Sequence, residues 1–214
     1  VASCVENGAD YCDLTGEVQW IRRMIDAHHA TAVSNGVKIV HCCGFDSIPS
    51  DIGVFFLQKE AKKQFGQYCS EVKFRLKAAK GGFSGGTVAS LNNVMAEAEE
   101  DHSIYEILDN PYSLAPEGER EGVPQDDAME ADYDTDLQVH TAPFVMAPIN
   151  TKVVRRSNAL QDYPYGKDFQ YNEKIISGKG IKGNIAAKVI AKGMDWTMNA
   201  GSGSLIKRAM DRFL

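Results

Sequence analysis

The sequence lacks the features that mark several large classes of protein. No apolar run approaches the roughly 20 residues of a membrane-spanning helix, and no charged and then apolar leader is visible. Its 23 basic and 29 acidic residues give a net charge of −6, which offers no general attraction to nucleic acid or to an anionic membrane. With 43% hydrophobic and 24% charged residues, we expect a soluble globular chain of one large or two small domains.

The cysteines also lack a recognisable pattern. The five are odd in number and scattered, without a C-x-x-C spacing, whereas a disulfide framework prefers an even set in a shorter chain. We therefore expect reduced thiols and a cytoplasmic protein. His41 beside Cys42 and Cys43 comes closest to a metal site, but adjacent strand residues point to opposite faces, so we expect no metal there.

Residues 1–64 alternate predicted helices and strands. A helix ends at Gly8, short apolar strands follow at 11–14 and 37–42, and helices begin near Val18 and Asp51. Such alternation predicts parallel strands in an α/β sheet. The last of these helices is apolar almost all round in its first half, which predicts burial on more than one side.

Two parallel strands cannot form a stable open sheet by themselves. We expect no G-x-G-x-x-G phosphate-binding turn anywhere in the 214 residues. We therefore interpret this segment as the second half of a doubly wound Rossmann sheet whose phosphate-binding turn lies upstream, outside the chain. The bare apolar face of such a remnant predicts a homodimer, or a complex with the missing part.

The pattern changes near residue 70. Residues 71–79 alternate apolar with basic side chains, which predicts a half-exposed strand of a mixed or antiparallel sheet. A helix is predicted over 87–100, another from Pro148, and a docking helix over 181–214 that is broken at Gly193 and at residues 201–203. Residues 117–136 hold nine acidic residues and one arginine, which is typical of a solvated loop.

The chemistry is expected where the two parallel strands end, because open α/β sheets bind ligands at their carboxyl edge. The segments there are YCDLTGE, over 11–17, and CGFDSIPSD, over 43–51. Gly44 permits close backbone approach. Ser47 and Ser50 either cap the following helix or leave its N–H groups to hold an anion or a carboxamide oxygen, and both uses stay open.

These two strings, followed in order by SGGT, NPYSLAP, APFVMAPINTKVVRRS and YGKDFQY, resemble the saccharopine dehydrogenase-like oxidoreductases, in particular their trans-acting enoyl reductase branch. The resemblance runs from residue 1 to about 172. It implies the C-terminal half of a Rossmann dinucleotide-binding domain at 1–68, a substrate and dimerisation domain at 69–180, and C-terminal helices at 181–214 that pack back on the first domain. It also implies NAD or NADP, with the nicotinamide end flanked by Asp13, Leu14, Thr15, Gly16, Cys43, Gly44, Phe45, Asp46 and Ser47.

Hydride transfer needs positioning more than acid–base groups. Asp46 could orient the carboxamide or relay a proton, although capping is the commoner use of such a residue. Arg155 and Arg156, which lie in one of the resembling strings, or the basic face Lys73, Arg75 and Lys77, could bind a substrate carboxylate or phosphate. Solvated surface pairs are the alternative for the basic face, and Cys43 is expected to be buried and inert.

Two functions follow. The first is an NAD(P)-dependent oxidoreductase that transfers hydride to a C=N or C=C bond of a small-molecule or acyl substrate. The second is a non-catalytic, dimerising α/β interaction module without a nucleotide. Neither involves nucleic acid or a membrane span.

Overall fold

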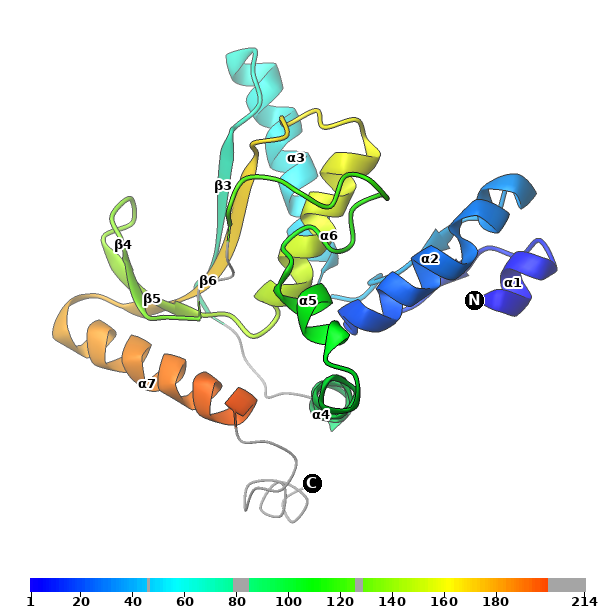
Figure 1. The fold of residues 1–214 in the computed structure, drawn as a ribbon. Helices are drawn as coiled ribbons and strands as arrows, with labels where there is room; N and C mark the ends of the chain where they lie inside the picture. The colour runs from blue at the N-terminus through cyan, green and yellow to red at the C-terminus, as the bar shows by residue number, and fades with distance from the viewer. Residues whose placement is uncertain (46, 79–84, 126–128, 200–214) are drawn as a thin grey trace. The chain divides into compact units, whose positions relative to one another are not determined.

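The computed structural model describes residues 1–45, 47–78, 85–125 and 129–199 (Figure 1). The chain divides into two compact units, each assembled from separate stretches. Unit 1 comprises Val1–Val72, Ser103–Gln125 and Pro148–Tyr171, and unit 2 comprises Lys73–His102, Asp126–Ala147 and Asn172–Leu214. The domain boundaries expected at residues 68 and 180 stay a prediction.

Unit 1 begins with the predicted alternation of helix and strand. Its helices are α1 (Ala2–Glu6), α2 (Val18–Asn35), α3 (Ile48–Phe65), α5 (Ser103–Asp109) and α6 (Ala147–Leu160). Its strands β1 (Tyr11–Cys12) and β2 (Ile39–Val40) pair in parallel, which confirms the predicted direction. Helix α2 ends at Gly36, whose φ of 67° places it in the left-handed region that favours glycine.

The prediction for helix α3 is wrong in one respect. Its buried face carries Val54, Gln58 and Ala61 at helical spacing, so the described part of unit 1 covers one side of the helix. The apolar residues on the rest of its surface are exposed, between 45% and 64%: Ile52, Phe55, Phe56 and Leu57. The bare face expected of a sheet remnant stays a prediction.

Three arginines hold the irregular segment after α5. Arg22 of α2 donates from Nη1 to the carbonyl oxygens of Ser113 (2.9 Å) and Ala115 (3.3 Å). The other two, Arg155 and Arg156 of α6, donate to carbonyl oxygens of the same segment, residues 110–116. Because a guanidinium presents several donors in a fixed plane, it satisfies buried carbonyls that no regular element could pair.

Unit 2 contains most of a four-stranded sheet. The strand order is β3 (Glu71–Leu76), β6 (Gln170–Gly178), β5 (Val139–Pro143), β4 (Asp132–Asp134), and the first residues of β3 and β6 belong to unit 1. Strand β5 is antiparallel to both neighbours, whereas β3 runs in the direction of β6 (Figure 1), so the sheet is mixed as expected. The doubly wound Rossmann arrangement stays a prediction.

Helices α4 (Gly85–Glu100) and α7 (Gly180–Asn199) complete unit 2, and α7 packs against β5. The predicted break at Gly193 is wrong, because α7 continues through it. A glycine inside a helix costs only about 1 kcal/mol relative to alanine, and tertiary packing outweighs that cost. The breaks predicted at residues 201–203 lie outside the described residues.

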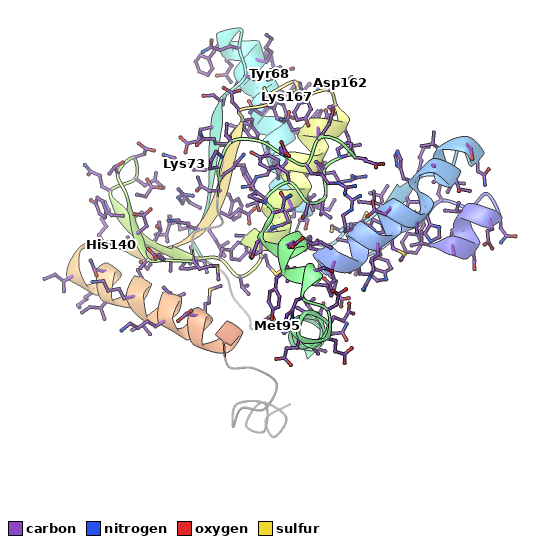
Figure 2. All side chains as sticks on the ribbon, in the orientation of Figure 1. Tyr68, Lys73, Met95, His140, Asp162 and Lys167 are labelled. Atoms are coloured by element: carbon purple, nitrogen blue, oxygen red, sulfur yellow. The ribbon has the colours of Figure 1, made fainter. Side chains whose placement is uncertain are left out.

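The last part of the acidic segment, residues 132–136, is not the solvated loop that its composition suggested, because its aspartates pair with basic residues of the sheet. Asp134 binds Arg75 Nε, Asp136 binds Lys73 Nζ (both 2.6 Å) and Asp132 binds Lys174 Nζ (2.8 Å). Figure 2 shows Lys73 on its strand. Lys73 and Arg75, two of the three basic residues considered for binding a substrate anion, are therefore already paired with aspartates of this segment. The hydrogen bond from Lys174, with that from the Tyr133 N–H, holds the pKa of Asp132 below its usual value.

Candidate functional site

The ends of β1 and β2 are tied together by backbone hydrogen bonds. The Asp13 N–H donates to Val40 O (3.3 Å), and the Cys43 N–H donates to Asp13 O (2.7 Å). These bonds prolong the parallel pairing into the two loops that follow it. We call these loops, 13–17 and 41–47, the carboxyl-end site; residue 46 itself lies outside the described residues.

The Asp13 carboxylate is the centre of this site. Oδ1 accepts the N–H groups of Thr15 and Cys42 (both 3.1 Å), and Oδ2 lies 2.6 Å from His41 Nδ1. Because a carboxylate only accepts, the short contact assigns a proton to Nδ1. Both side chains are largely buried, with 13% of Asp13 and 10% of His41 exposed.

Cys42 takes the backbone conformation that lets this network form. Its φ of 60° lies in the left-handed region, which a non-glycine residue seldom adopts. The hydrogen bond from its N–H to Asp13 holds the turn in place. Strained residues of this kind concentrate at functional sites, where the surrounding contacts maintain them.

Two aromatic rings fix the orientation of the His41 imidazole. The rings of Trp20 and Tyr11 meet it edge-on, with centroids 5.3 Å and 6.1 Å away. Burial, followed by the negative charge of Asp13, raises the pKa of the Tyr11 phenol. Tyr11 is therefore neutral across the physiological range.

Cys43 is half-buried next to this pair. Burial raises the pKa of its thiol, and the neighbouring Cys12 and Asp13 raise it further. The thiolate needed for nucleophilic chemistry is thereby disfavoured, as the sequence predicted. All five cysteines are free thiols.

Apolar side chains stand beside the polar pair. Leu14, two residues after the end of β1, is 75% exposed, and Phe45, in the loop that follows β2, is 89% exposed. A Cβ placed on Gly44 would lie 3.4 Å from the Leu14 side chain, so the two loops approach each other here. We call Leu14 and Phe45 the apolar lip.

The helices that leave the site begin without side-chain caps. Ser47 occupies the N-cap position of α3, but its hydroxyl donates to Asn150 Oδ1 (2.8 Å) instead of accepting a helix N–H. Glu17 likewise makes no side-chain cap for α2. Of the two uses left open for Ser47, side-chain capping is therefore not the one that the structure shows, and the first-turn N–H groups of both helices lack a side-chain cap.

Arg155 and Arg156 have contacts of another kind. Arg155 donates to the carbonyl oxygens of Pro111 (3.3 Å) and Tyr171 (3.2 Å), and Arg156 donates to Leu114 O (2.6 Å). Burial lowers the pKa of Arg156. These contacts anchor backbone within unit 1, and substrate binding by the two arginines stays a prediction.

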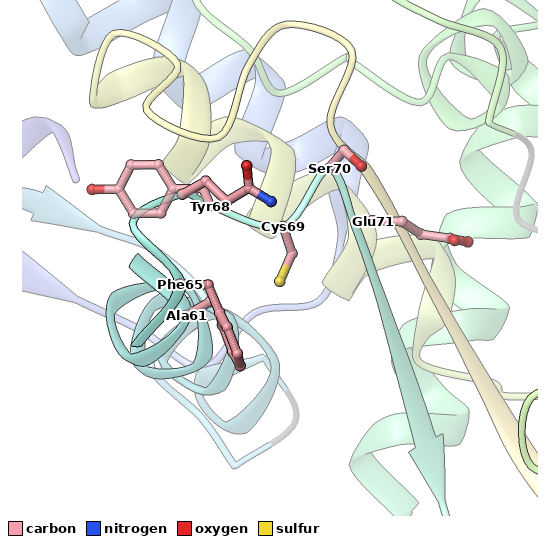
Figure 3. Close-up of a pocket in the computed structure, with 7 residues that line it drawn as sticks. Ala61, Phe65, Tyr68, Cys69, Ser70 and Glu71 are labelled. Carbon is pink, nitrogen blue, oxygen red and sulfur yellow. The ribbon is translucent and has the colours of Figure 1, made fainter. Parts of the chain in front are cut away.

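A separate pocket of about 280 Å³ lies at the end of α3 (Figure 3). Its lining includes Phe65, Tyr68 and Cys69, with no cluster of charged groups. Over the described residues, no group of three His, Cys, Asp or Glu side chains could hold a metal ion. The described helices also include none that is long and apolar enough to cross a membrane.

Similarity to known proteins gives this geometry a context. The chain is 40% identical over 195 residues to a Mycobacterium tuberculosis protein provisionally named trans-acting enoyl reductase, an alignment that covers 88% of the chain and 46% of the relative. Trans-acting enoyl reductases of Mycobacterium ulcerans and Mycobacterium bovis are 36% and 34% identical, over 99% and 94% of the chain and 53% and 50% of the relatives. The chain is a homologue of these proteins.

The chain spans about half the length of these trans-acting enoyl reductase relatives. No protein-family model matches it, and no solved structure does.

Sequence reasoning missed two features. The first is His41, which was weighed only as a metal ligand; a histidine one residue past β2, opposite an aspartate one residue past β1, was the available signal. The second is the spacing G-x-G-x-x-G at Gly178–Gly183, after β6 and at the start of α7. The expectation that this spacing lies outside the chain is therefore wrong as a statement about sequence.

Proposed function

We propose that the chain forms part of an NAD(P)-dependent oxidoreductase that reduces the enoyl group of an acyl substrate. The observation that carries the proposal is homology, over nearly the whole chain, to proteins named trans-acting enoyl reductase. Membership of the saccharopine dehydrogenase-like group, and the interpretation of β1 and β2 as half of a Rossmann sheet, belong to the same proposal.

The carboxyl-end site has the chemistry that a nicotinamide needs. The apolar lip offers surface to the face of the ring, and the uncapped first turns of α2 and α3 offer N–H groups to a carboxamide oxygen. The group, when bound, supplies hydride. The residues proposed to flank it are Asp13, Leu14, Thr15, Gly16, Cys43, Gly44, Phe45 and Ser47, together with Asp46, whose carboxyl is proposed to orient the carboxamide.

The glycines at 178–183 do not extend this site to the pyrophosphate. A Cβ on Gly183 would lie 2.4 Å from the Gly178 carbonyl oxygen, so the third glycine serves the packing of α7 on the end of β6. In a dinucleotide-binding fold, a G-x-G-x-x-G turn follows one strand and begins a helix, and that helix leads to a second strand parallel to the first. Here the spacing follows β6 of a mixed sheet, whose neighbour β5 runs antiparallel to it.

The exposed apolar surface of α3 carries the proposal of a homodimer. Four large apolar residues on successive turns expose a patch that a monomer seldom leaves in water. Light scattering on the chain in solution tests it: a mass of twice 23.5 kDa is expected, and a monomer that binds no hydrophobic dye refutes it. A cytoplasmic location stays a prediction.

Dinucleotide binding and hydride transfer test the function directly. NADPH and NADH fluorescence would be titrated with this chain and with the longest polypeptide that its gene encodes. The longer polypeptide would then be given 4-deuterated NADPH or NADH and the N-acetylcysteamine thioester of crotonic acid. Transfer of deuterium to the β carbon is expected. Absence of both binding and transfer refutes the enzyme and leaves the dimerising module.

A further inference from the structure

The polar pair Asp13–His41 has a feature that cofactor binding does not require. Nδ1 of His41 is fixed on Asp13 at 2.6 Å, and the structure gives Nε2 no hydrogen-bond partner among the described residues. The imidazole therefore has one nitrogen engaged in holding the ring and the other available to a ligand. A carboxylate behind Nδ1 is the arrangement that orients a histidine for proton transfer.

The surroundings allow the ring little freedom to change this orientation. Trp20 and Tyr11 meet it edge-on, and nine-tenths of the side chain is buried. Asp13 is held in turn by the N–H groups of Thr15 and Cys42. Because each group in this network is fixed by another, Nε2 keeps a single direction without needing to be ordered by substrate.

The position in the fold is also suitable. His41 and Asp13 each follow one of the two parallel strands, at the edge where ligands of open α/β sheets bind. The same two loops carry the exposed apolar lip. A polar proton donor beside apolar surface matches an enoyl thioester, which has a polarised double bond on an apolar chain.

We propose that His41 is the catalytic acid of enoyl reduction and that Asp13 is its positioning residue. The inference rests on the proposed function. As hydride forms a C–H bond at the β carbon, the π electron pair moves to the α carbon. The Nε2–H bond of the His41 imidazolium breaks, and its proton forms the C–H bond at the α carbon. The neutral imidazole then takes a proton from water, so each turnover consumes one hydride and one proton.

The protonation state sets the expected pH dependence. A neutral ring with its proton on Nδ1 has only a lone pair at Nε2, so the donor must be the imidazolium, and kcat is expected to fall at higher pH, where the ring has lost that proton. The titratable groups that contact the ring are Asp13 and Tyr11, and the Cys43 thiol lies against the His41 backbone carbonyl. Tyr11 and Cys43 stay neutral in this range, because burial and neighbouring charge raise both pKa values.

The decisive experiment compares His41→Gln with His29→Gln, a histidine exposed on α2, in the longest polypeptide of the gene. We expect His41→Gln to lower kcat for the crotonyl thioester by about 10²-fold or more while the Kd for NADPH or NADH changes less than twofold. His29→Gln should leave both unchanged. In D₂O the wild type should show a solvent isotope effect on kcat and place deuterium at the α carbon.

A wild-type measurement keeps the test valid if the variant does not fold. The descending limb of the kcat–pH profile should coincide with the pKa of His41 measured by NMR titration, and added imidazole should partly restore turnover in His41→Ala. Hydride transfer with a flat profile through that pKa, or with full kcat in His41→Gln, overturns the role of His41 and leaves the proposed function intact. Absence of dinucleotide binding and hydride transfer in the wild type overturns both.

Discussion

Two ion pairs on the same strand isolate the effect of burial on stability. Arg75–Asp134 and Lys73–Asp136 each have an N–O distance of 2.6 Å. The first pair is 10% and 3% exposed, and the second is 33% and 66% exposed. Arg75 also donates to Asn172 Oδ1 (2.7 Å) and to the carbonyl oxygen of Phe74 (2.8 Å), so its removal affects partners on β4, β6 and its own strand.

Replacing Arg75 by methionine should destabilise unit 2 strongly. The substitution leaves the Asp134 carboxylate buried with only the N–H groups of Asp136 and Leu137, at 3.1 and 3.0 Å, as partners. Removing one member of a buried pair costs about 3 kcal/mol, whereas an exposed pair contributes at most about 1 kcal/mol. With a urea m value of about 3 kcal/mol per M, Arg75→Met should lower the midpoint by about 1 M and Lys73→Met by about 0.3 M or less.

Urea unfolding followed by circular dichroism measures both midpoints, and the pH dependence provides a second check. Burial opposes ionisation of Asp134, but the hydrogen bonds from Leu137 and Arg75 prevail and lower its pKa. Its contribution is therefore complete above about pH 4, the usual value of a free aspartate, and is lost as the pH falls through the lower folded value. Equal midpoint losses in Arg75→Met and Lys73→Met would refute the reasoning.

Other substitutions test the backbone and a buried acid. Gly183→Ala should lower the free energy of unfolding by about 3 kcal/mol or prevent folding, because the added Cβ would lie 2.4 Å from the Gly178 carbonyl oxygen. Gly193→Ala places its Cβ where no atom lies within 4 Å, so it should raise the free energy of unfolding by about 0.5–1 kcal/mol. Thermal melts would compare the two, and equal effects would contradict the packing argument. Burial raises the pKa of Asp51 despite its hydrogen bond with Ser157. Asp51→Asn should therefore stabilise the chain at pH 7, with a gain that vanishes below about pH 4; a melt series that shows no gain at pH 7 contradicts this.

Local patterns in the sequence predicted local structure well. The start of α2 at Val18, the parallel pairing of β1 with β2 and the start of α6, within one residue of the predicted Pro148, depend on chain breakers and periodicity within short segments. The predictions were wrong where contacts between residues far apart in the sequence determine the structure. The acids after residue 130 are counter-ions of β3 and β6, and the exposure of Phe56 depends on what covers α3, neither of which periodicity reports.

In the candidate site, too, local sequence predicted some features and long-range contacts determined the others. The loops at the ends of the parallel strands follow from strand order, so Asp13 could be placed there from sequence. The role of His41 could not, because its contact with Asp13 joins residues 28 positions apart at 2.6 Å. The anchoring of loop carbonyls by Arg155 likewise depends on contacts from 16 to 44 positions away.

The interleaving of the two units constrains how the chain can acquire its structure during synthesis. The chain alternates between the units after Val72, His102, Gln125, Ala147 and Tyr171. The ribosome must therefore add about 100 residues after the first stretch of unit 1 before its last stretch exists, which takes about 5–20 s at typical elongation rates. Throughout that interval, the nascent chain exposes the surfaces that α6 will later cover, so we expect it to need protection by a chaperone until translation passes residue 171.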